Sequence, residues 1–161
     1  TMTNGVSAIT AEDIRWLRCD IKSLNLLGSV LAKQSAYEQG CNEAILHRDG
    51  IVTEGSSTNV FIAKNGILLT HPADNFILHG ITRAAVIQLA TDLNIEVRET
   101  AFHLHDLFAA DEVFLTGTTV EVTPVTIVDN RPVGAGVPGP LTKQLQQAFT
   151  SSIKRQASVN S

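Results

Sequence analysis

Cysteine is scarce in this sequence, with only Cys19 and Cys41 among 161 residues. Two cysteines at this spacing build no disulfide framework and match no zinc motif, so we expect a reduced, cytoplasmic protein. Long apolar runs are also missing, because no segment approaches the roughly 20 residues of a membrane-spanning helix. Basic residues are not in excess either: the formal charge is −4 and no basic stripe is visible. We therefore expect neither a membrane nor a nucleic acid as a partner.

Apolar residues make up 43% of the chain and charged residues 17%, which is typical of a folded globular protein. The length suits one domain with a sizeable core. The chain opens on "TMTNG", which looks like a cut site or an artificial remnant, and continues into "VSAITAEDIRW". We expect residues 1–13 to be a linker, residues 14–161 to form the domain, and the natural protein to be longer.

The first half of the chain predicts one helix. Ser23 is a suitable N-cap for a helix over residues 24–40, and Gly40 is a suitable end. Residues spaced by three and four along this segment would share one face, namely Leu24, Leu27, Leu31 and Ser35.

Two β-hairpins are predicted next, over residues 43–55 and 57–71. Their turns fall at Asp49-Gly50 and Asn65-Gly66, residue pairs that tolerate the positive φ angles of tight turns.

The second half mixes helices and strands. Residues 80–94 are typical of an amphipathic helix, with an apolar stripe formed by Ile81, Ala84, Ala85, Leu89 and Leu93. A strand over 95–100, a short helix over 104–111, one or two strands over 112–129 broken near Gly117, and a final helix over 141–156 follow. The mixture predicts an α/β fold with a mixed sheet and helices packed on it.

Lys22 and Glu54 are the first candidates for chemistry. Lys22 lies between apolar Ile21 and the start of the predicted helix, where partial burial would favour the deprotonated, nucleophilic amine. Glu54 ends a predicted strand and precedes "GSSTN", so its carboxylate could pair with a protonated ring nitrogen. The alternatives are a surface lysine and a strand-end charge facing water.

Two further segments suit a phosphate. In "HGITRAAV" a glycine precedes Ile81 and Thr82 at a helix start, where free backbone N–H groups and the helix dipole favour an anion. In "LTGTTVE" Gly117 allows close backbone approach, and Thr118 and Thr119 supply N–H and hydroxyl donors. An ordinary helix start and a strand bulge are the alternatives.

The remaining candidates for chemistry are weaker. His103 and His105 alternate with apolar residues but have no third ligand nearby in the sequence, so we expect no metal site. Cys19 beside Arg18 could have a lowered thiol pKa, with a buried structural cysteine as the alternative.

A lysine, a glutamate and two anion sites together suit an aldehyde cofactor with a ring nitrogen and a phosphate. The segments "RWLRCDIKSLNLL", "AILHRDGIVTEGSSTNVF", "LHGITR" and "TGTTVEVTPV" resemble, in this order, the D-amino-acid transaminases. These belong to the class IV pyridoxal-phosphate aminotransferases, with the branched-chain aminotransferases and aminodeoxychorismate lyases. The resemblance runs from about Ile14 to the C-terminus. It implies a barrel-like sheet with helices packed on it, the larger domain of that fold.

The resemblance also implies a role for individual positions. Lys22 matches the lysine that holds pyridoxal 5′-phosphate covalently and moves the substrate proton. Glu54 matches the carboxylate that keeps the pyridine nitrogen protonated. The other matched positions line the ring (Ser57, Leu78), bind the phosphate (Ile81, Thr82, Gly117, Thr118) or lie on the substrate side (Thr119). Gly117 stands where many relatives carry a serine, which removes one donor but leaves its N–H.

The implied activity is transamination between a D-amino acid, such as D-alanine, and a 2-oxo acid, by a homodimer. Family members carry another domain before the "AEDIRW" segment, which supplies a phosphate-binding arginine and groups for the substrate carboxylate, so we expect this chain to be the cofactor-holding domain. The alternatives are an aminodeoxychorismate lyase, a branched-chain aminotransferase, or a fragment that folds without cofactor.

Overall fold

The computed structural model describes residues 5–12, 22–56, 58–72, 80–117 and 120–160. For residues 22–29 and 155–160 it describes the backbone only. Four helices and nine strands lie in these ranges. In chain order they are β1 (Val6–Glu12), α1 (Lys22–Glu38), β2 (Glu43–Arg48), β3 (Ile51–Gly55), β4 (Asn59–Lys64), β5 (Ile67–Thr70), α2 (Ile81–Asp92), β6 (Val97–Glu99), α3 (Leu104–Ala109), β7 (Glu112–Gly117), β8 (Glu121–Val128), β9 (Arg131–Pro132) and α4 (Pro140–Asn160).

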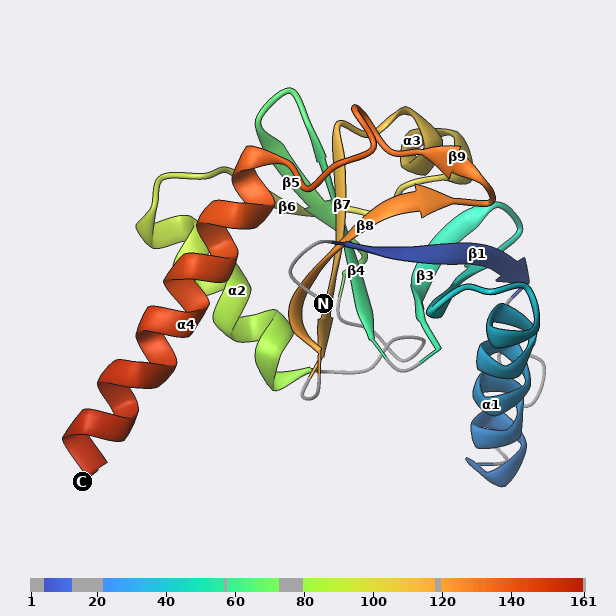
Figure 1. The fold of residues 1–161 in the computed structure, drawn as a ribbon, viewed down its shortest axis with the longest axis horizontal. Coiled ribbons are helices and arrows are strands. Elements are labelled where there is room, and N and C mark those ends of the chain that lie inside the picture. Colours follow the sequence, from blue (N-terminus) through green and yellow to red (C-terminus); the bar gives the residue numbers. More distant parts are fainter. Residues whose placement is uncertain (1–4, 13–21, 57, 73–79, 118–119, 161) are drawn as a thin grey trace.

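The nine strands form one mixed sheet in the order β3-β2-β1-β8-β7-β4-β5-β6, with β9 on β8. β1 runs parallel to β2 and β8, and β5 runs parallel to β6, while the other pairs are antiparallel. The Gly55 N–H donates to the Thr58 carbonyl at 2.8 Å, so edge strand β3 turns directly into β4 in the other half of the sheet. The sheet therefore curls, which confirms the expected barrel-like mixed sheet with helices packed on it (Figure 1).

Both predicted hairpin turns are confirmed. Asp49 and Gly50 have φ angles of 53° and 82°, and Asn65 and Gly66 have φ angles of 54° and 80°. Two successive positive φ angles in a two-residue loop match the twist of antiparallel strands. These turns connect β2 to β3 and β4 to β5.

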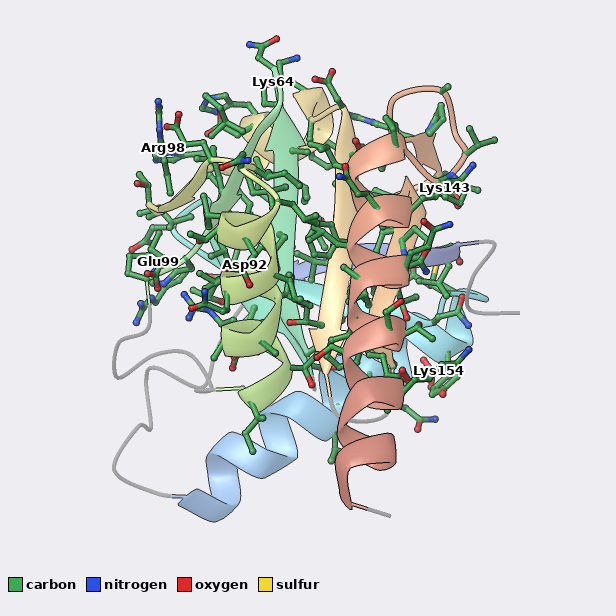
Figure 2. All side chains as sticks on the ribbon, turned by 90° about the vertical axis from the view of Figure 1, so that its left-hand side faces the viewer. Lys64, Asp92, Arg98, Glu99, Lys143 and Lys154 are labelled. Atoms are coloured by element: carbon green, nitrogen blue, oxygen red, sulfur yellow. The ribbon has the colours of Figure 1, made fainter. Side chains whose placement is uncertain are left out.

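The buried apolar residues form three clusters. The largest lies on the side of the sheet that α3 covers and includes Ile45, Val52, Ile62 and Leu115. A second cluster packs Phe61 and Phe114 against α2 and α4, with the two rings stacked at 4.9 Å. Figures 1 and 2 show α2 and α4 side by side on this face, with Lys143 and Lys154 projecting from α4 on the side away from α2. The third cluster lies under α1.

The predicted helices are present, but their predicted apolar stripes are confirmed only in part: Leu89 packs against the second cluster, the side chains of Leu24 and Leu27 lie outside those described, and other members are exposed. On α2, Ile81 is 88% exposed and Ala84 is exposed, whereas Val86 and Ala90 are fully buried. On α1, Leu31 is 54% exposed and Ala36 is buried. α1 also begins at Lys22, so Ser23 lies inside its first turn rather than at the N-cap. Spacing alone does not reveal which of the apolar residues on each helix face the sheet.

The predicted linker over residues 1–13 is wrong for Val6–Glu12, which form β1 between β2 and β8. Val6 and Ala8 belong to the largest cluster, and Thr10 donates from its N–H and hydroxyl to the Asp129 carboxylate at 2.8 and 2.5 Å. Both neighbours of β1 are distant in sequence, so no local turn signal marks it. Among the described helices, none is long and apolar enough to cross a bilayer.

Candidate functional site

Several candidate segments meet at one end of the sheet. β3 ends at Gly55 where β4 begins at Asn59, and the last residues of β7 pair with Asn59 and with the first residue of β8. α2 starts at the same end, because a Cβ atom on Gly80 would lie 2.6 Å from Asn59 Oδ1. In Figure 1 the end of β7, the start of β4 and the start of α2 lie along the lower edge of the sheet.

Glu54 lies at this end and is 5% exposed. Ile45 pairs with Gly55 and His47 pairs with Val52. Between these two pairs β3 advances by three residues while β2 advances by two. The extra residue is a β-bulge at Thr53–Glu54, a feature that re-aims side chains and is frequent beside active sites. The structure therefore holds a carboxylate in a protein interior at the end of a strand, rather than facing water.

The start of α2 is open to an anion. Its N-cap is Gly80, which has no side chain to accept from the first-turn N–H groups, and no side-chain cap is formed. The Thr82 side chain is buried and near these groups, whereas the Ile81 side chain points to solvent. Uncapped N–H groups and the helix dipole at the start of a 12-residue helix favour a negative charge. Ile81 can contribute only its backbone N–H.

The second predicted phosphate segment is described in part. Gly117 ends β7 and pairs with Glu121, the first residue of β8, which has a φ of 55°. Its neighbour Thr116 is fully buried, and its hydroxyl has no hydrogen-bond partner among the described residues. A buried hydroxyl usually has a partner, so within the described part of the chain Thr116 offers a donor and an acceptor next to Gly117.

The structure does not describe all the predicted site residues. Ser57, Leu78, Thr118 and Thr119 lie outside the described residues, as does Cys19. Lys22 is the first residue of α1, and only its backbone is described.

His103 and His105 are stacked at 5.5 Å beside Asp106, and their side chains are more than half exposed. Among the described residues no group of three or more His, Cys, Asp or Glu could hold a metal ion.

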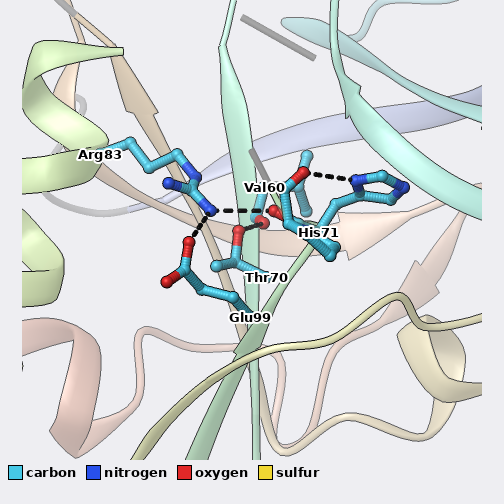
Figure 3. A network of polar contacts seen from close by, with 6 residues as sticks. Val60, Thr70, His71, Arg83 and Glu99 are labelled. Atoms are coloured by element: carbon cyan, nitrogen blue, oxygen red, sulfur yellow. Dashed lines mark hydrogen bonds and ion pairs between the residues drawn. The ribbon is translucent and has the colours of Figure 1, made fainter. Parts of the chain in front are cut away.

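Arg83 is a site-adjacent residue that the sequence reasoning missed. It lies in the first turn of α2, is 5% exposed, and donates from Nη2 to the His71 carbonyl at 2.9 Å and to Glu99 Oε1 at 2.8 Å (Figure 3). The guanidinium thus connects the start of α2 to the segment after β5 and to β6. An arginine within an otherwise apolar helix pattern was the available signal.

Glu43 was also missed. It is the first residue of β2, is 3% exposed, and accepts hydrogen bonds from three described residues. The Ala44 N–H and the Ser56 hydroxyl donate to Oε1, and the Thr58 hydroxyl donates to Oε2 at 3.1 Å. Two of these donors belong to the turn that follows Glu54. No feature of the sequence links position 43 to positions 56 and 58.

These donors and acceptors suit one kind of ligand. A buried carboxylate can pair with a protonated ring nitrogen, and an uncapped helix start with a nearby glycine turn can bind a phosphate. The described residues therefore fit pyridoxal 5′-phosphate.

A family model described as "Amino-transferase class IV" matches residues 2–128. The chain therefore belongs to the class IV aminotransferases. It is 56% identical over 150 residues to the D-alanine aminotransferase of Bacillus licheniformis, covering 93% of this chain and 53% of that protein. It is 52% identical over 153 residues to the D-alanine aminotransferase of Staphylococcus aureus (strain COL), covering 95% and 54%. The chain spans about half the length of the curated relatives it matches.

Solved structures agree on the fold. The branched-chain amino acid aminotransferase of Escherichia coli matches with a TM-score of 0.84 and 39% identity, covering 94% of this chain and 53% of that one. The branched-chain amino acid aminotransferase of Thermobaculum terrenum, solved in its PLP-form, matches with a TM-score of 0.83 and 34% identity, covering 92% and 51%.

Proposed function

We propose that this chain is the cofactor-holding domain of a pyridoxal-phosphate aminotransferase that moves an amino group between a D-amino acid, such as D-alanine, and a 2-oxo acid. One observation carries the proposal. Buried Glu54 on its bulge and the uncapped start of α2 lie at the same end of the sheet. The family and the relatives named D-alanine aminotransferase support the reaction class.

Nine positions would contact the cofactor or the substrate. Glu54 would hold a proton on the pyridine nitrogen, and the amine of Lys22 would bind the cofactor's aldehyde carbon and carry a proton to and from the substrate Cα. The N–H groups at the start of α2 and at Gly117 would bind the phosphate, with the Thr116 hydroxyl beside them. The complete set is Lys22, Glu54, Ser57, Leu78, Ile81, Thr82, Gly117, Thr118 and Thr119.

When bound, the protonated pyridine ring supplies an electron sink for the carbanion that forms at the substrate Cα. Burial of Glu54 matters for this role, because a carboxylate with little solvent contact attracts a ring proton more strongly than an exposed one. A phosphate fixed at two backbone segments would prevent the ring from rotating away from Glu54 and Lys22.

The groups that select the substrate would lie in another part of the whole protein. The matched relatives are about twice as long as this chain. A separate domain of the whole protein would supply the phosphate-binding arginine and the groups that hold the substrate carboxylate. The proposed whole protein is a cytoplasmic homodimer.

A branched-chain aminotransferase is the second candidate. It is favoured by the solved structures, which are branched-chain enzymes at 34–40% identity. The curated D-alanine aminotransferases are 51–56% identical over a similar span, which favours the D-amino acid reaction. An aminodeoxychorismate lyase on the same scaffold is the third.

The test is a titration of the chain with pyridoxal 5′-phosphate, followed by addition of candidate substrates to the whole protein. We expect a yellow absorbance band that Glu54→Gln weakens, while Glu38→Gln, at the exposed end of α1, serves as the control. We expect D-alanine with 2-oxoglutarate to give pyruvate. Turnover of a branched-chain L-amino acid or of aminodeoxychorismate in its place would contradict the substrate class.

A further inference from the structure

Two buried glutamates outside the proposed contact set accept hydrogen bonds from a neighbouring chain segment. Glu43 accepts from the Ala44 N–H, the Ser56 hydroxyl and the Thr58 hydroxyl. Glu112 accepts from the Leu141 N–H at 3.1 Å and from the N–H and hydroxyl of Thr142 at 2.8 and 2.7 Å. Each carboxylate therefore fixes a chain segment that approaches the sheet. Glu112 fixes the start of α4, and Glu43 fixes the turn between β3 and β4.

The turn that Glu43 holds begins one residue after Glu54. The Ser56 N–H donates to the Ala44 carbonyl at 3.0 Å and the Gly55 N–H donates to the Thr58 carbonyl at 2.8 Å. The side-chain bonds to Glu43 therefore reinforce a turn that the backbone already closes. The two hydroxyl donors, Ser56 and Thr58, lie two residues apart in this turn, so the Glu43 carboxylate binds both sides of the turn.

Packing around Gly55 shows that the turn has no spare room. A Cβ atom at Gly55 would clash with Thr58 Oγ1 and would lie 3.2 Å from Glu43 Oε2. The turn can approach Glu43 this closely only because residue 55 is glycine. Burying a carboxylate away from water costs free energy, and hydrogen bonds from several donors offset that loss of hydration.

We propose that Glu43 is a positioning residue: by accepting hydrogen bonds from Ser56 and Thr58, it fixes the turn after the β3 bulge and thereby holds Glu54 toward the pyridine nitrogen of the bound cofactor. This inference rests on the proposed function. Glu43 is not one of the nine proposed contact positions. It acts through the position of Glu54, in the way that an outer hydrogen bond orients a metal ligand or a catalytic histidine.

The test compares Glu43→Gln with Glu112→Gln in the full 161-residue chain. Both changes keep the side-chain shape and remove a buried charge that accepts three hydrogen bonds. We expect similar losses of thermal stability. We expect only Glu43→Gln to weaken pyridoxal-phosphate binding, by about tenfold, the equivalent of one charged hydrogen bond. The pH titration of the bound cofactor's absorbance should also shift only in Glu43→Gln.

A second measurement needs no cofactor. Hydrogen exchange of the Gly55 and Ser56 amides should accelerate in Glu43→Gln and remain unchanged in Glu112→Gln, where the Thr142 amide should accelerate. If Glu43→Gln does not fold, Thr58→Val removes one donor and should raise the dissociation constant by about threefold.

Three results separate the outcomes. Equal loss of cofactor affinity in both glutamine variants would overturn the inference, because affinity would then follow stability. Unchanged exchange of the Gly55 and Ser56 amides in Glu43→Gln would overturn it as well. Failure of the unmutated chain to bind pyridoxal 5′-phosphate would count against the proposed function, while the exchange comparison would still decide whether Glu43 holds the turn.

Discussion

Arg83→Met removes the guanidinium that connects the start of α2 to the rest of the fold, and it provides the sharpest test of the structure around that helix. Arg83 makes two contacts of different quality through the same Nη2 atom (Figure 3). The His71 carbonyl accepts at 2.9 Å in a buried setting, whereas Glu99, at 2.8 Å, has a side chain that is 49% exposed. Methionine keeps most of the apolar stem and loses both contacts.

The expected magnitude follows from those surroundings. The buried hydrogen bond from a charged donor contributes about 1.5–3 kcal/mol. The ion pair with half-exposed Glu99 contributes about 0–1 kcal/mol after solvent screening. Arg83 Nε is buried and has no hydrogen-bond partner among the described residues, so removing it relieves some desolvation. We expect Arg83→Met to lower the free energy of unfolding by about 2–3 kcal/mol.

Glu99→Gln is the matched comparison, because it weakens the ion pair and leaves the bond to the His71 carbonyl intact. We expect it to cost less than about 1 kcal/mol. Urea denaturation followed by circular dichroism measures both values under the same conditions. Equal losses in the two variants, or no loss in Arg83→Met, would refute the reasoning that the buried carbonyl contact anchors α2.

The remaining predictions concern packing and turns. Val86→Ala, at a fully buried position of α2, should lower the free energy of unfolding by about 2 kcal/mol. Ile81→Ser, at an 88% exposed side chain, should change it by less than about 0.5 kcal/mol. A larger loss in Ile81→Ser than in Val86→Ala would contradict the buried face that the structure shows. Gly139→Ala would place a Cβ atom against the Glu112 carboxylate and should lower the melting temperature more than Gly50→Ala, which has positive φ but open space around it. Equal shifts in a thermal melt would contradict the packing of Gly139 on Glu112.

The fold was predictable wherever a local signal exists. Asp49-Gly50 and Asn65-Gly66 define their hairpins because the turn chemistry is contained in two adjacent residues. β1 was not predictable, because its two parallel neighbours lie far along the chain and its alternating pattern is short. The buried face of α2 was misassigned because Thr82 and Arg83, both polar, are buried there by their positions at the helix start.

The candidate site also contains residues with a local sequence signal and residues without one. Glu54 was found from its place at a strand end, but its bulge depends on pairing with β2, which a single strand does not reveal. The open start of α2 was expected from Gly80 and Thr82, and the structure places it beside Asn59. Glu43 and Arg83 could not be predicted, because each acts on a segment that only the folded sheet brings close.

The central claim is that the amine of Lys22 binds the aldehyde of pyridoxal 5′-phosphate while Glu54 faces the ring nitrogen. The most direct measurement is borohydride reduction of the cofactor-loaded protein, followed by peptide mapping with mass spectrometry. The account predicts a single phosphopyridoxyl label on the peptide that contains Lys22. A label on Lys33 or Lys143, or an unlabelled chain after saturation with cofactor, would contradict it.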